Sequence, residues 1–206
     1  MDMVGSQIEA RGVRMPSVLA AMRQVPRHCF VPEACREAAY DDTPLPIGHG
    51  QTISQPYIVG LMTELIRPEP EFTVLEIGAG SGYQAAVLAE LVRKVYTIEI
   101  VAPLAKAAQE RLRKAGYRNV EVIRGDGYHG WPSQAPYDAI LVTAAAPEIP
   151  PPLIGQLKTG GRMVIPVGEP GGVQQLVLGE KLGPEKFRET PVLPVRFVPF
   201  TRQRPT

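Results

Sequence analysis

Between residues 73 and 168, short apolar runs alternate with longer amphipathic segments, and this alternation is the strongest constraint on the fold. Short runs rich in β-branched residues are typical of buried strands, whereas apolar residues at i, i+3, i+4 and i+7 are typical of helices. Strands that alternate with helices form a parallel sheet, because right-handed crossovers carry the helices onto its faces. The sequence therefore predicts an α/β protein with a twisted, mostly parallel sheet and helices on both faces.

The predicted elements follow this alternation along the chain. Strands are expected at 73–80, 94–100, 120–127, 137–146 and 162–168. Helices are expected at about 55–66, and at 83–93, 102–116 and 151–161. Residues 6–40 are expected to form an N-terminal helical extension broken at Pro26 and Pro32, followed by a loop at 40–50. Two last strands, 174–179 and about 186–197, are expected to pair antiparallel.

Length and composition exclude several classes of protein. A chain of 206 residues is long enough for one α/β domain and short for two. A net charge of +1 leaves no strongly basic balance of the kind that binds nucleic acid or an anionic membrane. No apolar run approaches the roughly 20 residues of a membrane span, and the first residues lack the basic start and apolar core of a signal peptide. We therefore expect a cytoplasmic protein with neither a nucleic-acid nor a membrane partner.

The sequence LEIGAGSGY, residues 75–83, follows the first strand of this alternation and opens a helix. Glycines at such a junction let the backbone approach a ligand, and the N–H groups at the helix start point toward it. A dinucleotide fingerprint, G-x-G-x-x-G or A, needs its third small residue five positions after the first. Counted from Gly78, that position is Tyr83, whose side chain would obstruct close packing of helix and strand. The spacing therefore disfavours an NAD-dependent oxidoreductase.

The spacing E-x-G-x-G-x-G instead resembles the class I S-adenosylmethionine-dependent methyltransferases, and it predicts their Rossmann-like fold. Glu99 ends the second strand, 21 residues after Gly78, with two carboxylate oxygens placed to bind ribose hydroxyls. Asp126 and Gly127 follow the third strand, where the resemblance implies contact with adenine, and Thr143 ends the fourth. Open α/β sheets bind ligands at these strand ends. The predicted residues for the cofactor S-adenosylmethionine are Glu76, Gly78, Gly80, Gly82, Glu99, Ile100, Asp126, Gly127 and Thr143.

The stretch PLPIGHGQTISQPYIVGLMTELI, residues 44–66, resembles the N-terminal signature of the protein-L-isoaspartate O-methyltransferases. Further stretches resemble that family in the same order: VLEIGAGSGYQAAVLAEL, GDGYHGWP, APYDAILVTAAAPEIPPPLIGQLKTGGRMVIPVG and VRFVPF. The resemblance runs from about Val25 to Phe200. It implies methyl transfer from S-adenosylmethionine to the free α-carboxylate of an isoaspartyl residue in a damaged protein or peptide. The resulting ester collapses to a succinimide, which can reopen to normal aspartate.

The residue types suit this reaction. A carboxylate acceptor has a pKa of roughly 3.5 to 4, so at neutral pH it needs orientation rather than a general base. The chain has only three histidines and no evident metal-binding motif, and we expect no metal. A neutral hydroxyl can hold an anionic acceptor without neutralising it as a lysine would. The resemblance implies that Ser54 is the catalytic residue and binds the substrate. Thr52 would assist it, and Arg196 of VRFVPF would either bind substrate or have a structural role in the C-terminal strand.

Other interpretations stay open at this point. Ser54 at the start of a helix that contains Pro56 would also serve as an N-cap, which stabilises by about 1 kcal/mol. A small-molecule O- or N-methyltransferase is the alternative enzyme, and a non-catalytic cofactor-binding module is the alternative outside catalysis. For the repair enzyme we expect a monomer with one methyltransferase domain. Its parts would be a helical substrate segment (1–70), a cofactor-binding core (71–168) and C-terminal strands (169–206).

Overall fold

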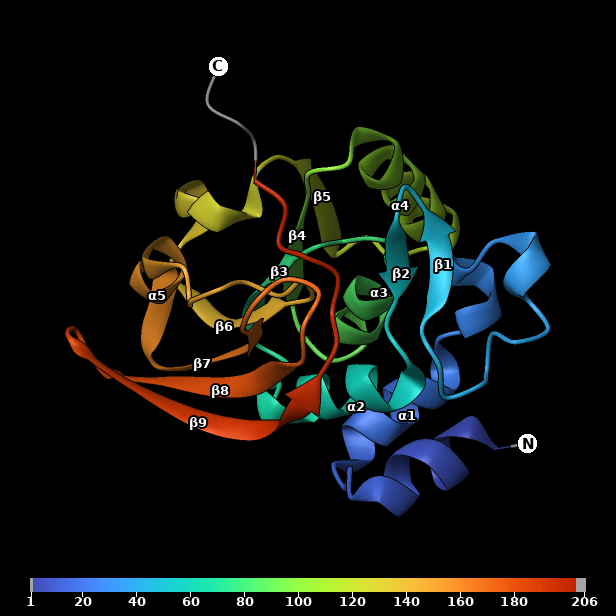
Figure 1. Ribbon diagram of the computed structural model, residues 1–206, viewed down its shortest axis with the longest axis horizontal. Helices are drawn as coiled ribbons and strands as arrows, with labels where there is room; N and C mark the ends of the chain where they lie inside the picture. The colour runs from blue at the N-terminus through green and yellow to red at the C-terminus, as the bar shows by residue number, and fades with distance from the viewer. Residues whose placement is uncertain (1, 203–206) are drawn as a thin grey trace.

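The structure is a computed structural model that describes residues 2–202. Seven strands form one sheet in the order β5-β4-β3-β6-β7-β8-β9 (Figure 1). The first five of these are parallel: β5 (Val120–Arg124), β4 (Lys94–Glu99), β3 (Thr73–Ile77), β6 (Tyr137–Val142) and β7 (Leu157–Val167). Two antiparallel strands complete it: β8 (Gln174–Gly183) and β9 (Lys186–Val195). The mostly parallel sheet and its antiparallel C-terminal pair confirm the prediction.

Helices cover both faces of this sheet. They are α1 (Pro16–Gln24), α2 (Pro56–Leu65), α3 (Tyr83–Ala89), α4 (Ala102–Lys114) and α5 (Pro151–Gln156). Neighbouring side chains on a strand point to opposite faces, so Val74 and Leu75 of β3 belong to two different apolar clusters. The Val74 cluster contains residues of α1, α2 and α3, and the Leu75 cluster contains Leu153 of α5. In the part of the chain that the structure describes, no helix is both long and apolar enough to cross a membrane.

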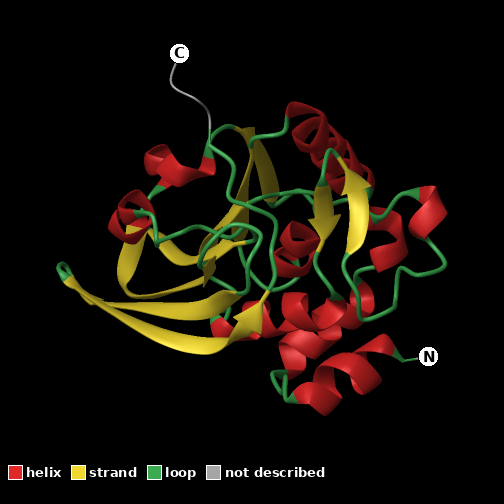
Figure 2. Cartoon of the chain, in the orientation of Figure 1, coloured by secondary structure: helices red, strands yellow, loops and turns green. Residues whose placement is uncertain are grey.

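The N-terminal extension is less regular than a run of α-helices. Short turns of other helix types flank α1 and recur after β5: η1 (Val4–Ile8), η2 (Glu9–Arg11), η3 (Arg27–Phe30), η4 (Glu33–Cys35), η5 (Gly127–His129) and η6 (Pro132–Gln134). The predicted break at Pro26 is confirmed, since α1 ends at Gln24 and Pro26 precedes η3. Figure 2 shows the short helical segments of the first 35 residues joined by loops on the N-terminal side of the molecule.

Two predicted segments are wrong in part. The segment 40–50 is not all loop, because it contains β1 (Leu45–Gly48), which pairs with β2 (Gln51–Ile53) in a hairpin. The hairpin turns through His49, whose φ is 54°, between two glycines with φ of 90° and 71°. Glycine adopts positive φ without steric cost, so the flanking glycines make this turn possible. The predicted helix 151–161 ends at Gln156, because Leu157 already pairs with Tyr137 as the start of β7.

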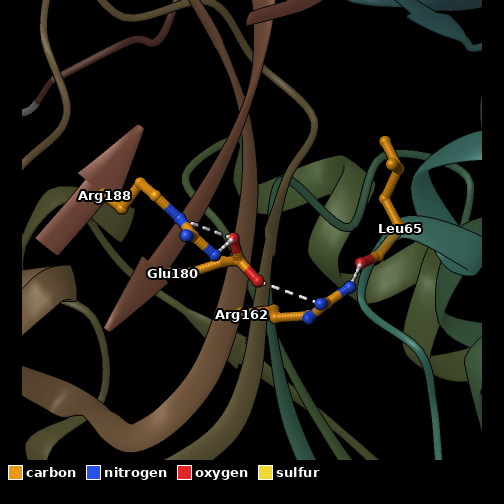
Figure 3. Close-up of polar contacts among 4 residues, drawn as sticks. All are labelled: Leu65, Arg162, Glu180 and Arg188. Carbon is orange, nitrogen blue, oxygen red and sulfur yellow. Dashed lines mark hydrogen bonds and ion pairs between the residues drawn. The ribbon is translucent and has the colours of Figure 1, made fainter. Parts of the chain in front are cut away.

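Two ion pairs connect β7, β8 and β9, and a hydrogen bond connects this network to the end of α2. Arg162 on β7 donates from Nη2 to Glu180 on β8 at 2.9 Å and from Nη1 to the Leu65 carbonyl at 3.2 Å (Figure 3). Arg188 on β9 donates to the other Glu180 oxygen at 2.5 and 3.1 Å. The hydrogen bonds from Arg188, together with the charge of Arg162, hold the pKa of Glu180 below its ordinary value. The network therefore fixes the sheet edge to the helix that follows the β1–β2 hairpin.

Candidate active site

The glycine loop between β3 and α3 is fastened to the neighbouring strands. The N–H groups of Gly78 and Ala79 both donate to the Ile98 carbonyl, at 2.8 and 3.1 Å. Gly78 has a φ of 98°, and a Cβ placed on it would lie 2.4 Å from Thr143 Oγ1. Position 78 is therefore restricted to glycine by its backbone conformation and by the side chain of Thr143.

Thr143 holds the same loop from the end of β6. Its hydroxyl lies 2.7 Å from the Gly78 carbonyl and 3.0 Å from the Ile77 carbonyl, and its single proton is donated to this pair of acceptors. The Thr143 N–H also donates to Ile77 at 2.9 Å. Thr143 therefore fixes the position of the glycine-loop backbone through these hydrogen bonds.

Glu99 lies at the end of β4 with only 6% of its surface exposed. One carboxylate oxygen accepts the Gly80 N–H at 2.8 Å and the other accepts the Val101 N–H at 2.9 Å. These two bonds orient the carboxylate at the mouth of the glycine loop. It lines a first cavity together with other predicted cofactor residues, namely Gly78, Gly80, Ile100, Gly127 and Thr143.

A second cavity lies on the other side of the glycine loop. Its lining includes Thr52, Ser54, Glu76, Gly78, Gly80 and Thr143, so it has Thr52, Gly78, Gly80 and Thr143 in common with the first cavity. The Glu76 side chain is completely buried, and neither of its oxygens has a hydrogen-bond partner among residues 2–202. Burial raises the pKa of Glu76 to about 8, with the nearby Thr97 hydroxyl opposing the shift and Glu99 adding to it.

Ser54 lies between β2 and α2, half-buried against this second cavity. The N-cap interpretation of Ser54 is wrong, because the N-cap position of α2 is Gln55 and no side chain at that position caps the helix. Asp42 takes over this task. Its carboxylate accepts the Tyr57 N–H at 3.1 Å and the Gln55 side-chain amide at 3.2 Å. The Ser54 hydroxyl makes no hydrogen bond within the described part of the chain.

Three predicted site residues lie outside the lining of both cavities. Gly82 faces α4, where a Cβ would lie 3.2 Å from Leu112, so it allows close packing of α4 behind the loop. Asp126 accepts the Tyr128 N–H at 3.0 Å and begins the turn after β5. Arg196 is exposed and lines a groove that also contains Gln55, the residue after Ser54.

Sequence reasoning missed part of the first cavity. Val198, Pro199, Phe200 and Thr201 line it from the C-terminal segment, and Gln51 lines it from β2. The Phe200 N–H donates to the Ala145 carbonyl at 2.8 Å, which brings this segment to the end of β6. No short-range repeat of apolar residues in the sequence predicts that a C-terminal segment packs against the end of a distant strand. The quoted motif VRFVPF reaches Phe200 and is the only signal in the sequence that could have pointed to this wall.

The sequence profile of the family described as Protein-L-isoaspartate(D-aspartate) O-methyltransferase (PCMT) matches residues 1–205. This chain belongs to that family. A protein-L-isoaspartate O-methyltransferase 2 from Polaromonas sp. is 64% identical over 91% of this chain and 89% of its own length. A protein-L-isoaspartate O-methyltransferase from Opitutus terrae is 58% identical over 98% of this chain and 87% of its own length.

Solved structures of the family have the same fold. One protein-L-isoaspartate O-methyltransferase superimposes with a TM-score of 0.85 at 30% identity. The comparison covers 93% of this chain and 62% of the solved chain. A member from Plasmodium falciparum, solved in complex with S-adenosyl-L-homocysteine, superimposes with a TM-score of 0.84 at 26% identity. That comparison covers 98% of this chain and 97% of the Plasmodium chain. The predicted Rossmann-like methyltransferase fold is thereby confirmed.

Proposed function

We propose that this protein is a repair methyltransferase for L-isoaspartyl residues in damaged proteins and peptides. It transfers the methyl group of S-adenosylmethionine to their free α-carboxylate, and the ester then collapses to a succinimide. One observation carries the proposal: Ser54 and the glycine loop line the same cavity. An acceptor held at Ser54 and a cofactor held by the loop would therefore meet in one cavity.

The residues around the two cavities fit S-adenosylmethionine. The cofactor, when bound, supplies an electrophilic methyl group on a positively charged sulfur. Glu76 supports this assignment, because a buried carboxyl group with two unpartnered oxygens is matched by a ligand that carries positive charge. Glu99 and Ile100 would hold the ribose, and Asp126 and Gly127 the adenine. Gly78 and Gly80 leave room for close approach of the loop backbone, while Gly82 lets α4 support the loop from behind.

Ser54 is the proposed catalytic residue. Its hydroxyl has no competing partner among the described residues, so it can donate to an acceptor carboxylate. A hydrogen bond to a charged acceptor contributes about 1.5 to 3 kcal/mol, enough to select one orientation. Thr52, exposed at the end of the hairpin and lining both cavities, would assist. Arg196 would contact the substrate chain farther along the groove that begins at Gln55.

No histidine among the described residues lines either cavity, which agrees with a carboxylate acceptor. His28, His49 and His129 all fall within the described residues, and none of them lines either cavity. An amine or phenol normally has to lose a proton during methylation, and histidine is the side chain that most often accepts it. A carboxylate is already ionised at neutral pH and needs no such base.

The proposal extends to organisation and partners. We infer a cytoplasmic monomer that binds neither nucleic acid nor membrane, supported by the net charge of +1 and by the need to admit large damaged proteins. Residues 1–70 would serve the substrate and 71–168 the cofactor. The C-terminal part, 169–206, of which 203–206 lie outside the described residues, would serve both. Its residues 198–201 line the cofactor cavity. Size-exclusion chromatography with light scattering tests the monomer.

The reaction is tested with labelled S-adenosylmethionine and two synthetic peptides that differ only in one linkage, isoaspartyl or normal aspartyl. We expect labelling of the isoaspartyl peptide alone, with later release of the label as methanol. A small-molecule methyltransferase would label neither peptide while still binding the cofactor, and that result would refute the repair function.

A further inference from the structure

The C-terminal strap, residues 196–202, forms one wall of the proposed cofactor cavity. It leaves the sheet at the end of β9 and crosses the ends of the parallel strands as a loop (Figures 1 and 2). Ala145 at the end of β6 fastens its middle, donating to the Val198 carbonyl at 2.9 Å and accepting the Phe200 N–H at 2.8 Å. Gln174 fastens its start, accepting the Phe197 N–H at 2.9 Å.

A second attachment fixes the far end of the strap. Arg202 donates from Nε to Asp126 at 2.9 Å, and its guanidinium carbon lies 3.5 Å from the centre of the Tyr128 ring. Asp126 begins η5 and Tyr128 belongs to it, so Arg202 contacts the turn after β5 at two points. Only 8% of the Asp126 side chain is exposed, against 44% of the Arg202 side chain. The guanidinium therefore lies over the loop as an outer cover.

The β1–β2 hairpin also lines this cavity. Gln51 and Thr52 line it, and the Ile47 side chain lies against the glycine loop, 3.3 Å from where a Cβ on Gly80 would be. A ligand on the Glu99 carboxylate would therefore share its cavity with residues of both the hairpin and the strap. The strap has two backbone hydrogen bonds to Ala145 at its middle, and its far end is held through the side chain of Arg202.

We propose that Arg202 is a latch that keeps the strap closed over the bound cofactor and slows its release. This inference rests on the proposed function, since it assigns the first cavity to the cofactor. Arg202 is a positioning residue, because it does not line the cavity and acts on it through the strap residues 198–201, which do. A half-exposed ion pair contributes little on its own, but a guanidinium stacked on an aromatic ring adds to it. Together they predict a three- to tenfold effect on cofactor retention.

Arg202→Gln tests the latch in the full chain. Dissociation of S-adenosylhomocysteine is followed by rapid mixing with excess competitor, and its Kd by calorimetry. We expect both the dissociation rate constant and Kd to rise three- to tenfold, while the KM for the isoaspartyl peptide and the Tm stay unchanged. Arg113→Gln is the matched control, because Arg113 is an exposed arginine on α4 that lines neither cavity. It should leave all four quantities at wild-type values.

Two further variants separate the contacts. Arg202→Lys keeps the charge but loses the planar stacking group, and we expect an intermediate rate constant. Tyr128→Leu removes the stacking contact and leaves the bond to Asp126, so we expect an intermediate rate constant for it as well. The double variant Arg202→Gln/Tyr128→Leu should be no worse than Arg202→Gln, because Arg202→Gln already removes both contacts. Release of S-adenosylhomocysteine from Arg202→Gln at the same rate as from Arg113→Gln would overturn the latch.

Failure of the latch and failure of the repair function give different results. An enzyme that labels the isoaspartyl peptide, with equal release rates in Arg202→Gln and Arg113→Gln, keeps the function and loses the latch. An enzyme that binds S-adenosylhomocysteine and releases it faster in Arg202→Gln, but labels neither peptide, keeps the latch and loses the repair function. Wild-type protein that does not bind S-adenosylhomocysteine would overturn both.

Discussion

Replacing Glu76 by glutamine should make the protein progressively more stable than the wild type as the pH rises through neutrality. Glu76 is completely buried, and its oxygens have no hydrogen-bond partner among the described residues. Burial raises its pKa from the ordinary value of 4.5 to about 8. The folded protein therefore holds the Glu76 proton over a pH range in which the unfolded chain has already lost it.

The size of the effect follows from this difference in proton binding. Between pH 4.5 and about 8, the folded state binds one more proton at this site than the unfolded state. The free energy of unfolding therefore falls by about 1.4 kcal/mol for each pH unit in that interval. From pH 5.5 to 7.5 the contribution of Glu76 falls by about 2 to 3 kcal/mol. The stabilising effect of the protonated carboxyl is complete below pH 4.5 and is lost as the pH rises to about 8.

Glutamine has nearly the same shape as a protonated glutamate and does not titrate. Urea unfolding of the wild type and Glu76→Gln at pH 5.5, 6.5 and 7.5 therefore measures the effect as a growing difference between the two free energies. Glu185→Gln, at an exposed position, is the control and should follow the wild-type curve. Parallel pH profiles for the wild type and Glu76→Gln would refute the assignment of a proton to buried Glu76. The same variant should bind S-adenosylmethionine more weakly, because a bound cation favours ionisation of the Glu76 carboxyl and glutamine cannot ionise.

Three further variants test the site. Ser54→Ala should lower kcat/KM for the isoaspartyl peptide about 10- to 100-fold, the loss of one hydrogen bond to a charged acceptor, with no change in Tm because Ser54 does not cap α2. A rise of the same size in the KM for S-adenosylmethionine would contradict this. Asp42→Ala should lower the free energy of unfolding by about 1 kcal/mol in urea titrations, because the Tyr57 N–H loses its acceptor. Gly78→Ala should destabilise by about 1 to 3 kcal/mol and abolish cofactor binding by calorimetry, since its Cβ would lie 2.4 Å from Thr143 Oγ1. Wild-type cofactor affinity in Gly78→Ala would show that the loop tolerates a side chain there.

Much of the fold could be predicted because it depends on local patterns. The alternation of apolar runs with helical periods is a property of neighbouring residues, and it identified all five parallel strands. The spacing from Gly78 to Glu99 is likewise a property of the chain alone. Because parallel strands end at one edge of their sheet, that spacing was enough to predict that the two residues face one crevice, and in the structure both line the first cavity.

The boundaries that were wrong depend on partners distant in the chain. Nothing near residue 157 indicates that the helix stops at Gln156, because the cause is the pairing of Leu157 with Tyr137 on β6. Ser54 beside Pro56 has the local pattern of an N-cap. The N–H that it would have capped is instead taken by Asp42, which reaches α2 from the loop before the hairpin.

The sequence by itself determined the class of fold, the glycine loop and the acidic residue that ends β4, because strand and helix periods and motif spacings are short-range properties of the chain. Only the tertiary structure decided that the Ser54 hydroxyl is not used as a cap, that Glu76 is buried without a hydrogen-bond partner among the described residues, and that Arg202 joins the C-terminal strap to Asp126. Each of these depends on which distant groups contact a side chain, or exclude water from it, once the sheet has formed. A short-range sequence pattern cannot predict which residues distant in the chain become neighbours.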